Sequence, residues 1–259
     1  MAKIVIISGA GISAESGIST FRDSGGLWEE YDVKKVAHKG ALENNRTQTL
    51  EFYDKRRLEL ERKEPNKAHK VLANLKKSYP DDIAIITQNV DNLHEKAGSS
   101  KVIHLHGELT KVCSSINPYN SKYIQQLTPE HSHVNPGTKA GDGSLLRPFI
   151  VFFGESVPMI EPAAQETQKA DIFVIIGTSL NVYPAAGLIQ YCSPGIPIYL
   201  IDPSPVKTDN YHNIKHIEMG ASDGMKELMK DNYLFDLRNI HGKNPEVRSL
   251  FKYYAVGRK

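Results

Sequence analysis

The sequence predicts an α/β protein whose parallel sheet is covered by helices on both faces. Five segments are nearly continuous apolar runs rich in β-branched residues, as buried parallel strands are: 3–7, 83–87, 101–105, 172–176 and 197–201. Segments with helical patterns lie between or after them, at roughly 47–64, 66–78, 161–168 and 222–232. Strands that alternate with helices in this way indicate a doubly wound sheet.

The first strand runs directly into a glycine turn. Residues 8–14 read Ser-Gly-Ala-Gly-Ile-Ser-Ala, a Gly-x-Gly-x-x-Ala pattern. Such glycines let the backbone turn tightly and approach a pyrophosphate, whose charge rests on the amides of the following helix. A similar turn also opens α/β domains that bind no dinucleotide. The acidic strand end that dehydrogenases place about 20 residues later is missing. The turn therefore favours a dinucleotide site without hydride transfer.

Composition excludes several classes of protein. With 259 residues and 40% hydrophobic content, the chain can bury a sizeable core. A net charge of +2 gives no strong attraction to nucleic acid or membrane, and no apolar run approaches the ~20 residues of a membrane span. Cys113 and Cys192 make neither a disulfide framework nor a CxxC pair. We expect a cytoplasmic monomer that binds neither membrane nor nucleic acid.

Two stretches depart from the strand and helix pattern. Residues 112–146 contain several Pro and Gly turn signals without clear periodicity, which predicts an irregular insert. Residues 238–259 carry six Lys or Arg and one Glu, with aromatics among them. Such a tail can contact nucleic acid or an acidic partner, but a solvated terminal helix is the commoner alternative, so we assign it no role.

Polar residues follow the predicted strands. Asn89 and Asp91 come after the second strand and His106 after the third, while Thr178 and Asp202 follow later ones. Taken singly, each has a structural explanation, such as a helix cap or a hydrogen-bonded turn histidine. Because the carboxyl ends of parallel strands share one edge, we expect these side chains to converge near the glycine turn.

Together these residues resemble one family, the sirtuins, which are NAD-dependent protein-lysine deacylases. The similarity covers roughly residues 3–233 and includes Thr87-Gln88-Asn89-Val90-Asp91 and Leu105-His106-Gly107. The other matching blocks are 9–13, 17–18, 20–22, 26–28, 147–148, 153–155, 177–179, 182 and 184–185. Each block is weak alone, but their order and spacing make a chance match untenable.

The resemblance implies a domain organisation. A Rossmann-type NAD-binding domain would comprise 1–22, 80–111 and 147–237. A helical insert at 23–79 and the irregular insert at 112–146 would form a smaller module, followed by the basic tail at 238–259. The acyl-lysine of a protein substrate would enter the cleft between domain and module.

The resemblance also implies roles for individual residues. His106 would be the general base, with Asn89 and Asp91 as the nicotinamide-pocket pair; an imidazole with an unperturbed pKa near ~6.5 suits this task. The products would be nicotinamide, free lysine and O-acyl-ADP-ribose. The full set assigned to NAD is Gly9, Ala10, Gly11, Ser13, Phe21, Arg22, Trp28, Gln88, Asn89, Asp91, Gly177, Thr178, Ser179, Asp202 and Ala221.

Tyr53 and Arg56 bear on acyl choice. They stand three residues apart, so on a helix they share a face, and a phenol with a guanidinium suits a terminal carboxylate. On charge pattern alone, a solvated helix face is the better explanation. Sirtuins that remove succinyl and malonyl groups carry a similar Tyr-x-x-Arg pair, which implies desuccinylase or demalonylase activity, with deacetylation as a further activity.

Other resemblances concern the substrate peptide and a metal. Segments 153–155 and 181–183 resemble those between which the family's peptide lies as an added strand, so Phe153, Gly154, Glu155 and Val182 are assigned to substrate, and Val151 to the acyl tunnel with Phe153. Most sirtuins bind structural zinc through four cysteines in the second insert. This chain keeps only Cys113 there, with Ile116 where a second would stand, and we expect no zinc.

Three further positions differ from the family pattern: Asn92 replaces a usual Gly, Phe152 a common Trp and Asp202 a common Asn. Two other functions stay open at this point. An ADP-ribosyltransferase or NAD glycohydrolase would use the same ribose chemistry with another acceptor, and an NAD-sensing protein would bind without turnover. The presence of His106, Asn89 and Asp91 argues against an NAD-sensing protein without turnover.

Overall fold

The computed structural model describes residues 2–20, 32–178, 183–206 and 214–230. Its main feature is a six-stranded parallel sheet in the order β3-β2-β1-β7-β8-β9. The strands are β1 (Ile4–Ser8), β2 (Ile83–Thr87), β3 (Ile103–His104), β7 (Ile172–Ile176), β8 (Ile198–Ile201) and β9 (Ile214–Ile217). β1 pairs with β2 on one side and β7 on the other, so the strand order reverses there. In open α/β sheets, ligands bind at the carboxyl edge beside such a reversal.

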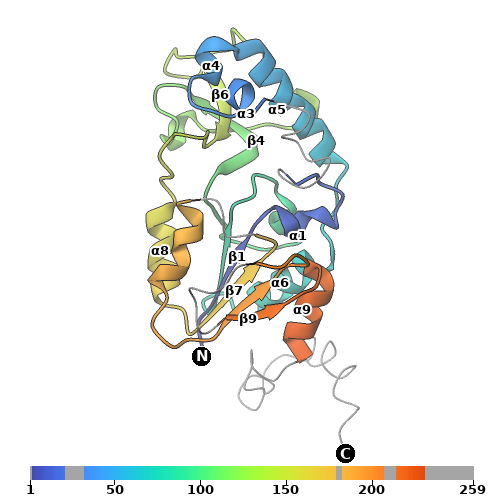
Figure 1. Cartoon of the computed structure of the whole chain (residues 1–259). Helices are drawn as coiled ribbons and strands as arrows, with labels where there is room; N and C mark the ends of the chain where they lie inside the picture. The colour runs from blue at the N-terminus through green and yellow to red at the C-terminus, as the bar shows by residue number, and fades with distance from the viewer. Residues whose placement is uncertain (1, 21–31, 179–182, 207–213, 231–259) are drawn as a thin grey trace, which may run out of the picture.

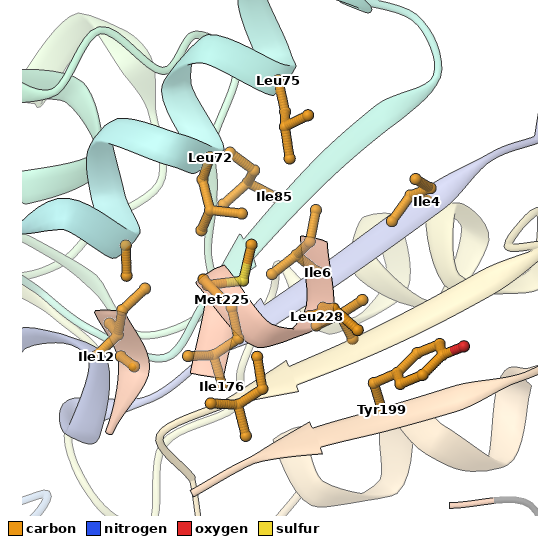
Figure 2. Packing of buried hydrophobic residues seen from close by; sticks show 14 of the residues in the cluster. Ile4, Ile6, Ile12, Leu72, Leu75, Ile85, Ile176, Tyr199, Met225 and Leu228 are labelled. Carbon is orange, nitrogen blue, oxygen red and sulfur yellow. The ribbon is translucent and has the colours of Figure 1, made fainter. Parts of the chain in front are cut away.

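Helices cover both faces of this sheet (Figure 1). On one face lie α6 (Lys67–Ser78) and α9 (Ala221–Lys230), whose apolar side chains pack on the strands as Figure 2 shows. On the other face lie α8 (Ile160–Gln168) and the 3₁₀ helix η3 (Ala185–Tyr191). Residues along β1, β2 and β7 are buried throughout, as strands covered on both faces must be. The predicted α/β class is confirmed.

A second, smaller sheet is antiparallel, in the order β5-β4-β6. Its strands are β4 (Gly107–Ser114), β5 (Gln125–Gln126) and β6 (Leu146–Ile150), with the 3₁₀ helices η1 (Ser121–Tyr123) and η2 (Pro129–His131) between them. Helices α3 (Val33–Val36), α4 (Ala41–Asn44) and α5 (Arg46–Glu61) pack against it. We call α3–α5 with this sheet the small module; Figure 1 shows it above the carboxyl edge of the large sheet, near α1 (Ala10–Ala14).

The structure differs from the sequence-based prediction at several elements. The expected strand at 101–105 pairs only over Ile103–His104, because the chain then turns to form β4. The expected irregular insert lies partly in the small sheet. The short α7 (Leu93–Lys96), η3 and β9 were not predicted. Among the described residues, no helix has the length and apolar character that crossing a membrane requires.

Candidate functional site

Two glycine turns meet at the carboxyl edge of the large sheet. Gly9 N donates to Ile176 O and Gly11 N to Gly177 O, both at 2.9 Å. A Cβ added at Gly9 would lie 2.7 Å from Gly177 O, and one at Gly177 would lie 2.3 Å from Ile12 N. Gly177 also has a φ of +61°. Side chains would force the turns apart, so these glycines are required by the approach of two backbones.

The predicted pair Asn89 and Asp91 lies beside this junction. Asn89 Nδ2 donates to Gly9 O at 3.0 Å and to Ser13 Oγ at 3.1 Å. Ser13 Oγ donates to Asp91 Oδ2 at 2.9 Å, and Leu93 N to Asp91 Oδ1 at 3.0 Å. Burial raises the pKa of Asp91, and the hydrogen bonds from Leu93 N and Ser13 Oγ offset part of that rise. The structure therefore joins three predicted residues in one buried network.

These residues line a pocket of about 290 Å³ between α1, α5 and the loop after β2. Five of its lining residues were predicted: Ala10, Ser13, Arg56, Asn89 and Asp91. The lining residues to which the sequence analysis gave no role are Gly17, Ile18, Ser19, Glu59, Leu60, Lys63, Val90 and Leu109. Helical spacing was an available signal for two of them, because Glu59 and Leu60 follow Arg56 by three and four residues on α5.

His106 follows β3 and is held through its ring. Its Nδ1 lies 2.8 Å from Gln88 O, an acceptor, so Nδ1 carries the proton and Nε2 carries a lone pair. Burial lowers the pKa of His106, and the hydrogen bond to the Gln88 carbonyl offsets part of this. Gln88 Nε2 in turn donates to Thr178 Oγ1 at 3.1 Å, which links the ends of β2 and β7. The ring is therefore neutral near pH 7 and able to accept a proton.

A second histidine, which the sequence analysis passed over, supports the same loop. His104 Nδ1 lies 3.2 Å from Asn89 O, and Nε2 lies 3.0 Å from Glu95 Oε1. Both partners are acceptors, so both ring nitrogens must carry protons to satisfy them. Burial lowers the pKa of His104, but its hydrogen bond to Glu95 and the charge of that carboxylate outweigh burial and raise it overall. His104 thus fixes the Asn89 carbonyl.

Two further residues assigned to NAD, Asp202 and Ala221, lie beside later elements of the sheet domain. Asp202 directly follows β8, and its Oδ1 accepts from Ser204 N at 2.9 Å. Ala221 is buried at the first position of α9. The amide of Ser222 donates to Glu15 Oε1 at 3.0 Å, so a carboxylate from the end of α1 occupies the start of α9. No local sequence pattern predicts this contact of Glu15, because it joins segments far apart in the chain.

The predicted acyl pair lies on α5, in two environments. Arg56 lines the pocket, with its guanidinium carbon 5.9 Å from the centroid of the Phe52 ring. Tyr53 is buried in the apolar cluster of the small module. Its ring meets Phe52 edge-on at 5.0 Å and stacks on Phe152 at 5.6 Å and 17°. Burial raises the pKa of Tyr53 well above its usual value, so its phenol stays protonated.

The segment assigned to the substrate peptide pairs with the small module. Phe153 N donates to Ala37 O, and Lys39 N donates to Phe153 O, both at 2.8 Å. Gly154 has a φ of +87°, and Glu155 accepts hydrogen bonds from Arg147. Val151 N donates to His106 O at 2.9 Å, which joins this segment to the candidate base. Phe21, Arg22, Trp28, Ser179 and Val182 lie outside the described residues.

Cys113 is buried in the small module, and burial raises its pKa to about 12. Within the described ranges, no group of three or more His, Cys, Asp and Glu residues could hold a metal ion. The absence of zinc stays a prediction. Hydrogen bonds to Asp142 connect the end of β4 to the loop before β6. Its carboxylate accepts from Ser114 Oγ, Asn117 Nδ2 and Ser144 Oγ at 2.6, 3.0 and 2.7 Å.

Comparisons with known proteins agree with this geometry. The Sir2 family model matches residues 9–184. An NAD-dependent protein deacylase of Bacteroides thetaiotaomicron is 56% identical over 228 residues, covering 88% of this chain and 97% of that protein. The chain therefore belongs to the Sir2 family.

Solved structures give the same result. A crystal structure of a Sir2 homolog–NAD complex superposes with a TM-score of 0.75 at 33% identity, covering 92% of this chain and 89% of the other. A structure of Sir2 with a p53 peptide and NAD⁺ superposes with a TM-score of 0.72 at 27% identity, covering 90% and 94%. Both carry the fold described above.

Proposed function

We propose that this chain, an NAD-dependent protein deacylase, removes succinyl and malonyl groups from lysine side chains, with acetyl groups as further substrates. The observation that carries the proposal is the position of the Arg56 guanidinium. It lines the same pocket as Asn89 and Asp91, so a carboxylate at the end of an acyl chain would meet a cation there. A charge-assisted hydrogen bond is about twice as strong as a neutral one, which is enough to decide substrate choice.

Tyr53 is the second element of this proposal. It precedes Arg56 by one helical turn, and its protonated phenol is a hydrogen-bond donor. A phenol donor and a guanidinium donor suit the two oxygens of one carboxylate. Acetyl-lysine has no such group, and would use the same pocket without these contacts.

The described residues also fit NAD at the carboxyl edge. The glycine junction of β1 and β7 leaves backbone without side chains where a pyrophosphate would lie. Each Asp91 oxygen accepts one protein hydrogen bond and has capacity for a second, as a carboxamide donor requires. When bound, NAD supplies an electrophilic ribose carbon after nicotinamide departs. His106, with its proton on Nδ1 and a lone pair on Nε2, would take a proton from a ribose hydroxyl.

We further propose that the inserts at 23–79 and 112–146 act together as one wall of the substrate cleft. Contacts between α5 and the second insert support this. Arg46 Nε donates to Pro136 O at 2.7 Å, and Leu50 packs with Val112, Val134 and Leu146. These contacts make the position of Arg56 dependent on both inserts.

Substitution of Arg56 by Met tests the acyl proposal. Arg56→Met keeps an unbranched apolar side chain and removes the charge. We expect the KM for a succinyl-lysine peptide to rise roughly 10- to 100-fold, the size of one lost charge-assisted hydrogen bond, while that for acetyl-lysine changes little. Lys55→Met, on an exposed position of the same helix, is the matched control and should leave both values unchanged. Equal effects of Arg56→Met on both substrates would refute the carboxylate role.

A further inference from the structure

The Phe152 ring joins two parts of the small module. It is 3% exposed and stands two residues after the end of β6. The Arg147 guanidinium carbon lies 4.5 Å from its centroid, and the Tyr53 ring stacks on it at 5.6 Å. Phe52 also touches Tyr53, but both residues belong to α5 and move together. The Phe152 stack is therefore a ring contact that links Tyr53 to the segment after β6, beside the apolar cluster that Tyr53 shares with Ile150 of β6.

Phe152 is itself held in place by an ion pair. Arg147 Nη1 and Nη2 donate to the two Glu155 oxygens at 2.6 and 2.9 Å, a bidentate arrangement. Phe152 N donates to Glu155 Oε2 at 2.8 Å, and Arg147 Nη2 also donates to Ile150 O at 3.0 Å. The Glu155 carboxylate thus binds both the Arg147 guanidinium, which lies over the Phe152 ring, and the backbone amide of Phe152. We call Arg147, Phe152 and Glu155 the Arg147 clamp.

The clamp also acts on Tyr53 through its charge. Burial raises the pKa of Tyr53, and the Arg147 guanidinium opposes that rise more strongly than Arg56 does. The Glu155 carboxylate of the same clamp acts in the opposite direction and raises that pKa. A donor that must meet one oxygen of a carboxylate has to be held within about 0.5 Å of its productive position. The stacking of Tyr53 on Phe152 and the Arg147 cation over the Phe152 ring supply such a restraint.

We propose that Phe152, held by Arg147 and Glu155, is a positioning residue that fixes the Tyr53 ring and thereby sets the discrimination between succinyl- and acetyl-lysine. The inference rests on the acyl preference proposed above. Phe152 acts through Tyr53 and makes no contact of its own with the acyl carboxylate. A shift of the Tyr53 ring costs one hydrogen bond to succinyl-lysine and none to acetyl-lysine, so the two substrates respond differently.

The test compares KM and kcat for succinyl- and acetyl-lysine peptides at saturating NAD. Phe152→Leu removes the stack, and we expect the succinyl KM to rise about 3- to 10-fold, as loss of an aromatic pair does, with the acetyl KM changed less than about 2-fold. Phe152→Trp keeps an aromatic face and should retain the wild-type ratio of the succinyl KM to the acetyl KM. Phe149→Leu is the matched control, because Phe149 lies on β6 and contacts Tyr119 at 6.4 Å instead of Tyr53.

A second variant guards against misfolding of Phe152→Leu. Glu155→Gln keeps an acceptor for Phe152 N but weakens the hold on Arg147, and should shift the KM ratio in the same direction by a smaller factor. If the wild type prefers succinyl-lysine but Phe152→Leu and Glu155→Gln change both substrates equally, or neither, the clamp is overturned and the acyl proposal survives. If neither the wild type nor Arg56→Met prefers succinyl-lysine, the acyl proposal and the clamp are both overturned.

Discussion

The large parallel sheet and the small module are held together in different ways. β1, β2 and β7 are fully buried between two apolar clusters, so apolar burial dominates there. In the small sheet, β5 is exposed, and polar contacts such as Ser114 to Asp142 and Arg147 to Glu155 make many of the connections. The sheet holds the backbone around the candidate base, and in our proposal the module presents the side chains that choose the acyl group. Changes on the sheet side should affect all acyl substrates alike.

The largest expected effect comes from the candidate base at the sheet edge. His106→Ala removes the Nε2 lone pair and should lower kcat/KM about 10²-fold or more for succinyl- and acetyl-lysine equally. Thermal unfolding should show an intact fold. His131→Ala, an exposed histidine of the small module, is the control and should behave as wild type. Wild-type turnover by His106→Ala, or a loss confined to one acyl group, would contradict the division between the two regions.

The glycine junction gives the next effect. Gly177→Ala places a methyl group 2.3 Å from Ile12 N at a φ of +61°. The positive φ should cost about 1–2 kcal/mol and the collision about 1–3 kcal/mol of unfolding free energy. NAD affinity, measured by titration, should fall as well. Gly143→Ala in the small module, with a φ of +80° and nothing within 4 Å, bears only the first cost. Similar losses of unfolding free energy in both variants would contradict the claim that the close approach of the two backbones requires glycine at position 177.

The smallest effect concerns acid and the Asp142 hydrogen bonds. Hydrogen bonds from Ser114, Asn117 and Ser144 hold the pKa of Asp142 well below its usual value. A carboxyl with a lowered folded pKa stabilises the fold fully above its unfolded pKa of about 3.9, and loses that contribution as pH falls through the folded pKa. The protection of the amides around 114–117 and 144 against hydrogen exchange, measured relative to their intrinsic rates, should therefore fall in acid, and in Asp142→Asn at neutral pH.

A matched change on the sheet side sharpens that test. Asp171 is an exposed carboxylate whose Oδ2 accepts from Lys3 N beside β1. Asp171→Asn should leave exchange in the small module unchanged. If Asp142→Asn instead quickens exchange along β1, β2 and β7, the module is not stabilised separately from the sheet.

The two regions also differ in how far sequence predicts them. β1, β2 and β7 were predicted to within one residue, because each is a continuous apolar run. β9 was missed because Lys215 and His216 interrupt its apolar residues at the sheet edge. β4 and β6 were missed because their pairing is long-range and shifts register between Gly107 and Val112. Such pairing depends on contacts that no local pattern contains.

The candidate site divides in the same way. Asn89, Asp91 and His106 could be predicted because they lie two to four residues after the ends of β2 and β3, two strands of one parallel sheet. The supporting contacts could not, because they join distant segments. His104 reaches Glu95, and Arg147 reaches the ring of Phe152, only in the folded chain. Glu155 was assigned to substrate from its motif, while its side chain turns to Arg147.

The most direct test of the acyl choice is the rate of nicotinamide release by the purified full chain with NAD and peptides that differ only in the lysine acyl group. We predict peptide-dependent release with a higher kcat/KM for succinyl- or malonyl-lysine than for acetyl-lysine. Equal or better use of acetyl-lysine would contradict the role given to Arg56 and Tyr53. Release that ignores the peptide would indicate an NAD glycohydrolase instead.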